Sequence, residues 1–168
     1  QTGDNALMFA SKNGEIDMVT TLIEKGANVN VQNKLGYTAL MMASFSGNID
    51  MAKLLIEKGA DVNAKNNING YNALMLAIRG KHTNVAKLLI EKGADVNLQN
   101  QTGDTALNIA RDIKTNDKDL LVGLGMDADV DADVDTNDNI STSDADLAMK
   151  DNSKVISREF SERRYLLS

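Results

Sequence analysis

The sequence predicts an all-α solenoid, in which short helical hairpins stack along one axis, and two repeated motifs are the basis for this prediction. The first motif opens on glycines spaced by 33, 34 and 33 residues: GDNALMFA at 3–10, GYTALMMA at 36–43, GYNALMLA at 70–77 and GDTALNIA at 103–110. The second motif, LIEKGA, is followed each time by Asn/Asp-Val-Asn and occurs at 22–27, 55–60 and 89–94. Self-similarity at a fixed period of this length is the signature of a repeat architecture.

The second copy shows how one unit is built. Thr38 is a good N-cap for a first helix over 39–44, and Gly47 interrupts that helix. Apolar residues then recur at a spacing of three to four, which predicts a second, amphipathic helix: Ile49, Ala52, Leu55 and Ile56. Gly59 ends this helix, because glycine enters the left-handed conformation at low cost. Helices this short are marginal alone, so the copies must stack to bury their apolar faces.

These residues resemble ankyrin repeats over about 126 of the 168 residues. The resemblance implies four repeats with extended, finger-like turns between them, at 1–33, 34–66, 67–100 and 101–126. The Thr-Pro-Leu-His signature of the family is replaced by Thr/Asn-Ala-Leu-Met in repeats 1 to 3. In repeat 4 an asparagine follows the leucine of this motif, at Leu107-Asn108. Without its proline and histidine, we expect the fold to survive and to lose some polar specificity between repeats.

Two local departures from the period lead to further expectations. The interval from Val62 to Gly70 is one residue longer than in the other copies, so the third finger is predicted to protrude or bulge. Repeat 1 has the apolar composition of an internal copy, since Leu7, Met8 and Phe9 would normally pack on a preceding repeat; we therefore expect the array to be longer at this end. Phe9 also aligns with core positions of the other repeats, which predicts that it is buried.

The segment 127–168 carries 11 acidic and 5 basic residues, and eight of the acids are aspartates within 127–146. We favour a degenerate fifth repeat with a last amphipathic helix, acting as a C-terminal cap. A solvated, disordered tail is the second interpretation, because like charges repel. The third is a calcium loop resembling an EF-hand, in which alternating oxygen ligands would surround one cation: Asp133, Asp135, Asn137, Asn139 and Asp144. Asp138 stands where that loop needs glycine, which disfavours the third interpretation.

Composition excludes several classes of function. The chain has no cysteine and one histidine, so thiol catalysis, Cys/His zinc sites and multi-histidine chemistry are ruled out. The net charge of −6 lies entirely beyond residue 126, and the neutral repeats lack the basic stripe of a nucleic-acid-binding protein. No apolar run is long enough for a membrane span. We expect no enzymatic activity and no cofactor, and we assign His82 to a hydrogen-bonded turn.

The resemblance also implies where a protein would bind, because finger tips and inner helices of ankyrin repeats line a concave surface. In repeat 2 the corresponding residues are Lys34, Leu35, Tyr37, Phe45 and Ser46, and in repeat 3 they are Ile68, Asn69, Tyr71 and Arg79. In repeats 1 and 4 they are Asp4, Lys12, Asn13, Thr102, Asp104, Asp112 and Ile113. Aromatic and arginine side chains are the usual anchors of interfaces, which favours the ridge of repeats 2 and 3, with polar ends. The alternative is that these are ordinary surface residues.

The sequence therefore predicts a non-catalytic module that binds a protein partner, as a monomer and without nucleic acid or membrane insertion. Two alternatives stay open. One is a calcium-responsive acidic tail, and the other is an interaction fragment of a larger multidomain protein. The sequence does not indicate a compartment.

Overall fold

The structure, a computed structural model, describes residues 5–127. Within residues 5–127 all regular elements are helices, arranged as four successive helical hairpins. The first helices of the hairpins are α1 (Ala6–Asn13), α3 (Ala39–Ser46), α5 (Ala73–Arg79) and α7 (Ala106–Asp112). The second helices are α2 (Ile16–Glu24), α4 (Ile49–Glu57), α6 (Thr83–Glu91) and α8 (Lys118–Gly123). The predicted all-α stack of helical hairpins is confirmed.

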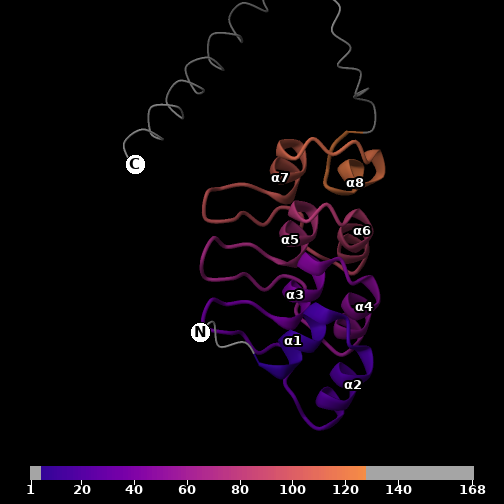
Figure 1. The fold of residues 1–168 in the computed structure, drawn as a ribbon. Helices are drawn as coiled ribbons and strands as arrows, with labels where there is room; N and C mark the ends of the chain where they lie inside the picture. The colour runs from indigo at the N-terminus through magenta and orange to yellow at the C-terminus, as the bar shows by residue number, and fades with distance from the viewer. Residues whose placement is uncertain (1–4, 128–168) are drawn as a thin grey trace, which may run out of the picture. The chain divides into compact units, whose positions relative to one another are not determined.

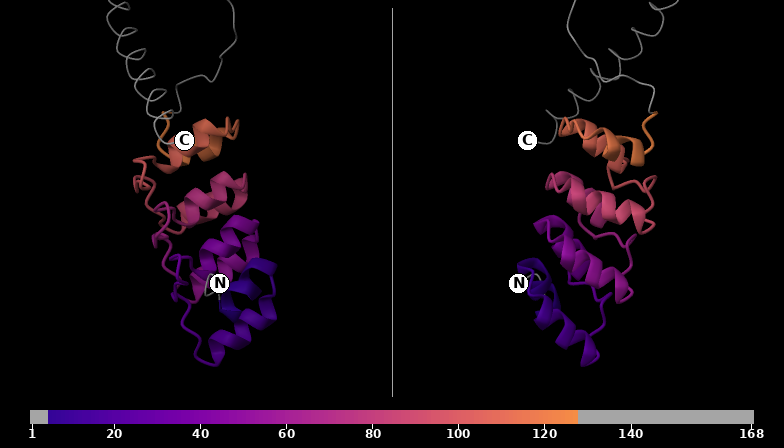
Figure 2. Two further views of the ribbon diagram at one scale, coloured as in Figure 1. Left: turned by 60° about the vertical axis from the view of Figure 1, so that its left-hand side comes forward. Right: turned by 90° about the vertical axis from the view of Figure 1, so that its right-hand side faces the viewer.

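The helices form two columns (Figure 1). The inner column contains α1, α3, α5 and α7, and the outer column contains α2, α4, α6 and α8. The fingers, at 28–37, 61–71 and 95–104, project from the inner column on the side away from the outer column. Figure 2 shows the same stacking from two further directions. Each inner helix packs on the next one along the chain, so the core is a continuous strip between neighbouring hairpins.

The helix ends follow the predicted capping residues. The hydroxyl of Thr38 accepts a hydrogen bond from the amide of Met41 at 3.3 Å, and Gly47 ends α3 with φ of 75°. Gly59 follows the end of α4 with φ of 89°. In repeats 3 and 4, lysines occupy the position of Gly47, and Lys81 and Lys114 have φ of 61° and 53°. This left-handed conformation is costly for a residue with a Cβ atom.

The exposure of repeat 1 differs from the sequence expectation. Leu7 and Met8 are 4% and 1% exposed, so the part of the chain that the structure describes buries both without a preceding repeat. The prediction that Phe9 belongs to the core is wrong, because its side chain is 56% exposed. The buried face of α1 is already occupied by the residues on either side of Phe9: Leu7, Met8, Ala10 and Ser11. Phe9 therefore lies on the opposite face with Lys12, one helical turn further on.

Three equivalent, buried asparagines shape the fingers: Asn33, Asn66 and Asn100. Their side-chain oxygens accept hydrogen bonds from backbone amides inside the turn, as Asn33 does from Leu35 and Tyr37 at 3.0 and 2.9 Å. The amide of Asn66 donates across five residues to the carbonyl of Tyr71, whereas the turns of the other two fingers close across four. The bulge predicted for the interval from Val62 to Gly70, in the second of the three fingers described above, is confirmed, and it leaves Ile68 52% exposed.

Polar side chains also join neighbouring repeats. The Asn30 side chain accepts from the amide of Asp61 at 2.7 Å and donates to the carbonyl of Gly59 at 3.0 Å. Asn48 Nδ2 donates to the carbonyl of Lys12 at 2.9 Å, and His82 Nε2 makes the corresponding bond to Phe45 at 3.0 Å. His82 is thus hydrogen-bonded at its turn, as predicted. These bonds supply polar contacts between repeats, although the missing proline and histidine of the family signature predicted a loss of such contacts.

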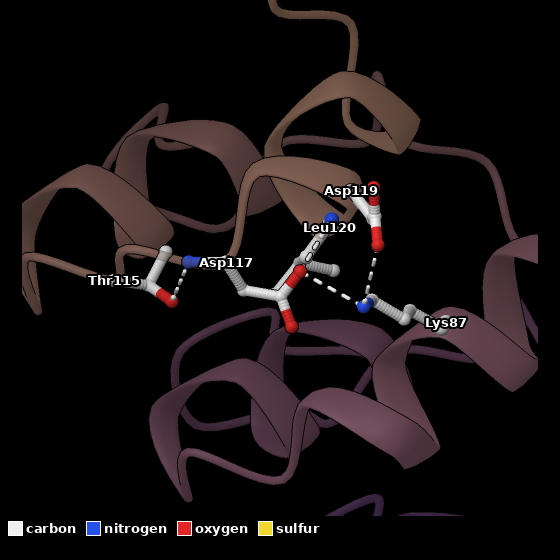
Figure 3. A network of polar contacts seen from close by, with 5 residues as sticks. All are labelled: Lys87, Thr115, Asp117, Asp119 and Leu120. Atoms are coloured by element: carbon white, nitrogen blue, oxygen red, sulfur yellow. Dashed lines mark hydrogen bonds and ion pairs between the residues drawn. The ribbon is translucent and has the colours of Figure 1, made fainter. Parts of the chain in front are cut away.

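An ion pair attaches repeat 4 to repeat 3 (Figure 3). Lys87 Nζ on α6 lies 2.8 Å from Asp117 Oδ1 and 3.6 Å from Asp119 Oδ2. Asp117 is also the N-cap of α8, where its carboxylate accepts from the amide of Leu120 at 2.9 Å. The hydrogen bond from Lys87, together with that amide, lowers the pKa of Asp117, and the same hydrogen bond to Asp117 raises the pKa of Lys87.

The predictions for the C-terminal segment fall on residues that the structure does not describe. The degenerate fifth repeat or cap at 127–168 and the calcium-loop set Asp133, Asp135, Asn137, Asn139 and Asp144 lie outside the described residues, Asp127 excepted.

Candidate protein-binding surface

The fingers and the exposed faces of the inner helices α1, α3, α5 and α7 form one surface, which we call the finger-side surface. One position of the hairpin, repeated along the stack, dominates it: Lys12, Phe45, Arg79 and Asp112. All four side chains are exposed, although they differ in size, polarity and charge. Because the same place in the fold accepts a base, an aromatic ring and an acid, helix packing does not dictate these residues. These residues can therefore be chosen to contact a binding partner.

We call these four equivalent positions the ladder. A surface pocket of about 200 Å³ lies beside its first two positions, between the first three inner helices. It is lined by Lys12, Tyr37, Met41, Met42, Phe45 and Leu76. The Phe45 side chain is 53% exposed, so an aromatic ring borders a mainly apolar hollow. The structure thus brings together three predicted residues, Lys12, Tyr37 and Phe45, with three side chains outside the predicted set, Met41, Met42 and Leu76.

Tyr71 has a different place from the one predicted. We expected an exposed aromatic anchor, but the Tyr71 side chain is 8% exposed. Its hydroxyl accepts a hydrogen bond from Arg79 Nη1 at 2.8 Å, and the guanidinium carbon lies 5.6 Å from the ring centroid. This contact combines a hydrogen bond with a cation–π interaction, so Tyr71 holds the Arg79 guanidinium in a fixed place.

The remaining predicted residues of repeats 2 and 3 lie on or near the fingers. Lys34 and Ile68 are exposed at the turns, and Leu35, Asn69 and Ser46 are half-buried. The Leu35 carbonyl accepts from the amide of Asn67 in the next finger at 2.9 Å. Neighbouring fingers are therefore fixed to one another, and the exposed residues at their turns form part of a continuous surface.

In repeat 4 the predicted residues are polar and partly satisfied within the finger. Thr102 Oγ1 donates to Asp104 Oδ2 at 2.6 Å, and the Asn100 side chain accepts from the amides of both residues. Asp112 is exposed at the end of α7, and Ile113 is half-buried. This end of the surface is polar, as expected. At the other end Lys12 and Asn13 are exposed and Asp4 lies outside the described residues, but the expectation of a polar end is wrong because Phe9 is exposed.

Acids and bases are unevenly distributed over the described part of repeats 1 to 3, although the outer side also carries bases, at Lys25, Lys53, Lys58, Lys81, Lys87 and Lys92. Within residues 5–127, the exposed faces of α1, α3 and α5 and the finger turns at 31–37 and 64–71 carry four bases and no aspartate or glutamate: Lys12, Lys34, Lys65 and Arg79. None of these four has a carboxylate partner within residues 5–127, where the ion pairs are those of Lys87. The acids among the described residues of the same repeats lie on or before the outer helices and at the bends that lead into the fingers: Glu15, Asp17, Glu24, Asp50, Glu57, Asp61, Glu91 and Asp95.

Other kinds of site find no support in the described part of the chain. Residues 5–127 contain no cluster of three or more histidine, aspartate or glutamate side chains arranged to hold a metal ion. Among the same residues, no helix has the length and apolar character needed to cross a membrane.

Comparison with known families agrees with this architecture. A family model described as ankyrin repeats in three copies matches residues 1–66, and one described as ankyrin repeats in many copies matches residues 43–90. The two matches together span residues 1–90, more than half of the 168-residue chain. No curated protein matches the sequence. The chain is a member of the ankyrin-repeat family, whose repeats generally act as non-catalytic modules for protein–protein interaction.

Proposed function

We propose that this chain recognises a partner protein through the finger-side surface of repeats 1 to 3, without catalysing a reaction. The observation that carries the proposal is Phe45, a half-exposed aromatic ring beside a mainly apolar pocket on the inner helices. Covering apolar surface is favourable by about 25 cal/mol per Å². A partner side chain that fills this pocket would cover Phe45 and displace water from its apolar lining.

The surface is held in place before a partner arrives, which supports the same proposal. Buried asparagines fix the finger turns, and the buried Tyr71 ring orders the exposed Arg79 guanidinium. A preorganised surface loses little conformational entropy when it binds, so more of the contact energy becomes affinity. Arginine and aromatic side chains are also the residue types most enriched among interface anchors.

Repeat 1 extends the proposed surface beyond the ridge expected from sequence. Phe9 is exposed on the same face of α1 as Lys12, and Lys12 lines the Phe45 pocket. The apolar part of the surface therefore runs from α1 to α5, and it becomes polar at repeat 4.

A capture experiment with matched variants tests the proposal. The full chain is immobilised as wild type, as Phe45→Ala and as Met18→Ala, since Met18 is similarly exposed at 50% but lies on the outer helix α2. We expect a partner protein from lysate to be held by the wild type and by Met18→Ala, and to be lost with Phe45→Ala. Circular dichroism melts of the three proteins should superimpose, because both positions are exposed. Equal capture by all three would contradict the proposal.

A further inference from the structure

We infer that the finger-side surface takes an extended acidic segment of its partner, with two carboxylates on Lys12 and Arg79 and an apolar side chain between them on Phe45. The inference rests on the proposed function and adds the chemistry of the partner. It follows from charge, spacing and fixed geometry at one ladder of exposed positions.

The charge of the finger-side surface restricts the charge that the partner segment can carry. Within the described residues of repeats 1 to 3, the inner-helix faces and the finger turns beyond the bends at Asp61 and Asp95 have four bases and no acid, and Lys12 and Arg79 have no carboxylate partner there. The guanidinium of Arg79 uses Nη1 on Tyr71, and its other N–H groups can receive a carboxylate in the bidentate geometry that arginine favours. A basic partner segment would be repelled here, and a neutral one would leave both charges unpaired.

The spacing of the equivalent positions on α1, α3 and α5 restricts the conformation of the partner segment. Lys12, Phe45 and Arg79 occupy one position on three inner helices packed in order, and packed helices lie about 8–10 Å apart. A polyproline II segment has three residues per turn and rises about 3.1 Å per residue. Every third side chain of such a segment thus returns to the same face after about 9 Å. The matching pattern is acid-x-x-apolar-x-x-acid.

An α-helix would need the same three side chains about seven residues apart, because it rises 1.5 Å per residue. A free helix of that length is marginal in water and pays a nucleation cost, whereas polyproline II is a major conformer of unfolded chains. The extended segment is therefore the better fit. The fourth position of the ladder, the exposed Asp112, disfavours a further acid and favours a base three residues on, which would set the direction of the segment.

A peptide selection tests the inference directly. A random library of 16-residue peptides displayed on phage is selected against the full chain at low salt. We expect enriched peptides to carry aspartate or glutamate at two positions six apart, with an apolar residue midway. Synthetic copies, measured by fluorescence anisotropy, should bind Phe45→Ala and Lys12→Glu about tenfold more weakly or worse.

A charge reversal gives the specificity readout. Lys12 is exposed and its side chain makes no ion pair within residues 5–127, so Lys12→Glu should fold as the wild type does. Selection against Lys12→Glu should replace one enriched acid by lysine or arginine and keep the other acid. Arg79→Gln should weaken the preference for the second acid only.

The outcomes separate this inference from the proposed function. Enriched peptides that lack acids, or that place them at the spacing of a helix, but still depend on Phe45 would overturn the inference and leave the proposed function standing. Acidic peptides that bind the Phe45 and Lys12 variants as tightly as the wild type would overturn both. No enrichment at all would overturn the linear-segment inference, with the capture experiment deciding the proposed function.

Discussion

At the scale of single residues, one position shows how the same fold tolerates different chemistry. The turn between the two helices of a hairpin needs a left-handed residue, and repeats 1 and 2 use Gly14 and Gly47 there. Repeat 3 uses Lys81, and repeat 4 uses Lys114. Lysine carries a Cβ atom into a conformation that costs roughly 1–2 kcal/mol for such residues. The last two hairpins therefore carry backbone strain that the first two do not.

Replacing Lys81 by glycine should relieve this strain. Glycine adds conformational entropy to the unfolded chain, worth roughly 0.5–1 kcal/mol, so we expect a net gain of about 0.5 kcal/mol in the free energy of unfolding. Urea denaturation of Lys81→Gly measures it. Lys53→Gly is the matched control, because Lys53 is exposed within α4 and the change should cost about 1 kcal/mol. A loss of stability at Lys81 equal to that of the control would refute the strain argument.

At the scale of elements, α8 shows how a short helix can be retained at the end of the described array. It has six residues, whereas α2, α4 and α6 have nine each. Asp117 serves it twice, as the N-cap and as the partner of Lys87 on α6. The attachment of α8 therefore depends on a charged carboxylate.

This dependence gives a pH prediction. The pKa of Asp117 in the folded protein lies below its ordinary value of 3.8, so its contribution is complete above that value and is lost as the pH falls through the lowered pKa. The raised pKa of Lys87 places its own loss above pH 10.5, outside this range. We expect the protection of the α8 amides against hydrogen exchange, relative to the unfolded chain at the same pH, to fall below about pH 4, before that of α5.

The Asp117→Asn variant isolates the charge, since asparagine is also a good N-cap. Its α8 should exchange faster than that of the wild type at pH 7, and the difference should shrink as the pH falls below 3.8 through the lowered pKa of Asp117. If the two proteins differ equally at pH 7 and throughout the acidic range, the Lys87 pair does not hold α8.

At the scale of the whole molecule, stability is a sum of hairpins and the interfaces between neighbours. The polar bonds of Asn30 belong to such an interface, because they join the end of repeat 1 to the bend of repeat 2. The hydrogen bonds of Asn48 and His82 act in the same way between the ends of the inner helices.

Removing the Asn30 side chain should loosen repeat 1 alone. Two lost hydrogen bonds on an exposed side chain are worth about 1–2 kcal/mol. In Asn30→Ala we expect faster hydrogen exchange across α1 and α2 and unchanged exchange across α5 and α6. The control is Asn84→Ala, at an exposed residue of α6. Uniform acceleration along the whole array would show that the repeats unfold as one block.

The sequence predicts most of the fold because each repeat restates the same helix caps and apolar spacing. It predicts the bulge after Asn66 for the same reason, since one extra residue breaks a strict period. The sequence prediction fails at Phe9 and Tyr71, because a repeat assigns each residue a position in the hairpin but does not show which side chains surround it there. The period likewise shows which repeat His82 faces, but not that the carbonyl of Phe45 is its partner.

The uneven placement of charge on repeats 1 to 3 has a kinetic consequence. With bases on the fingers and inner helices and most acids on the outer helices, the stack has a transverse electric dipole although the charges of residues 1–126 balance. An approaching anionic segment feels a torque as well as an attraction, so it is turned toward the fingers before contact. Such steering raises the association rate and weakens steeply as added salt shortens the Debye length. The dissociation rate, set by the Phe45 pocket, would change little over the same range of salt.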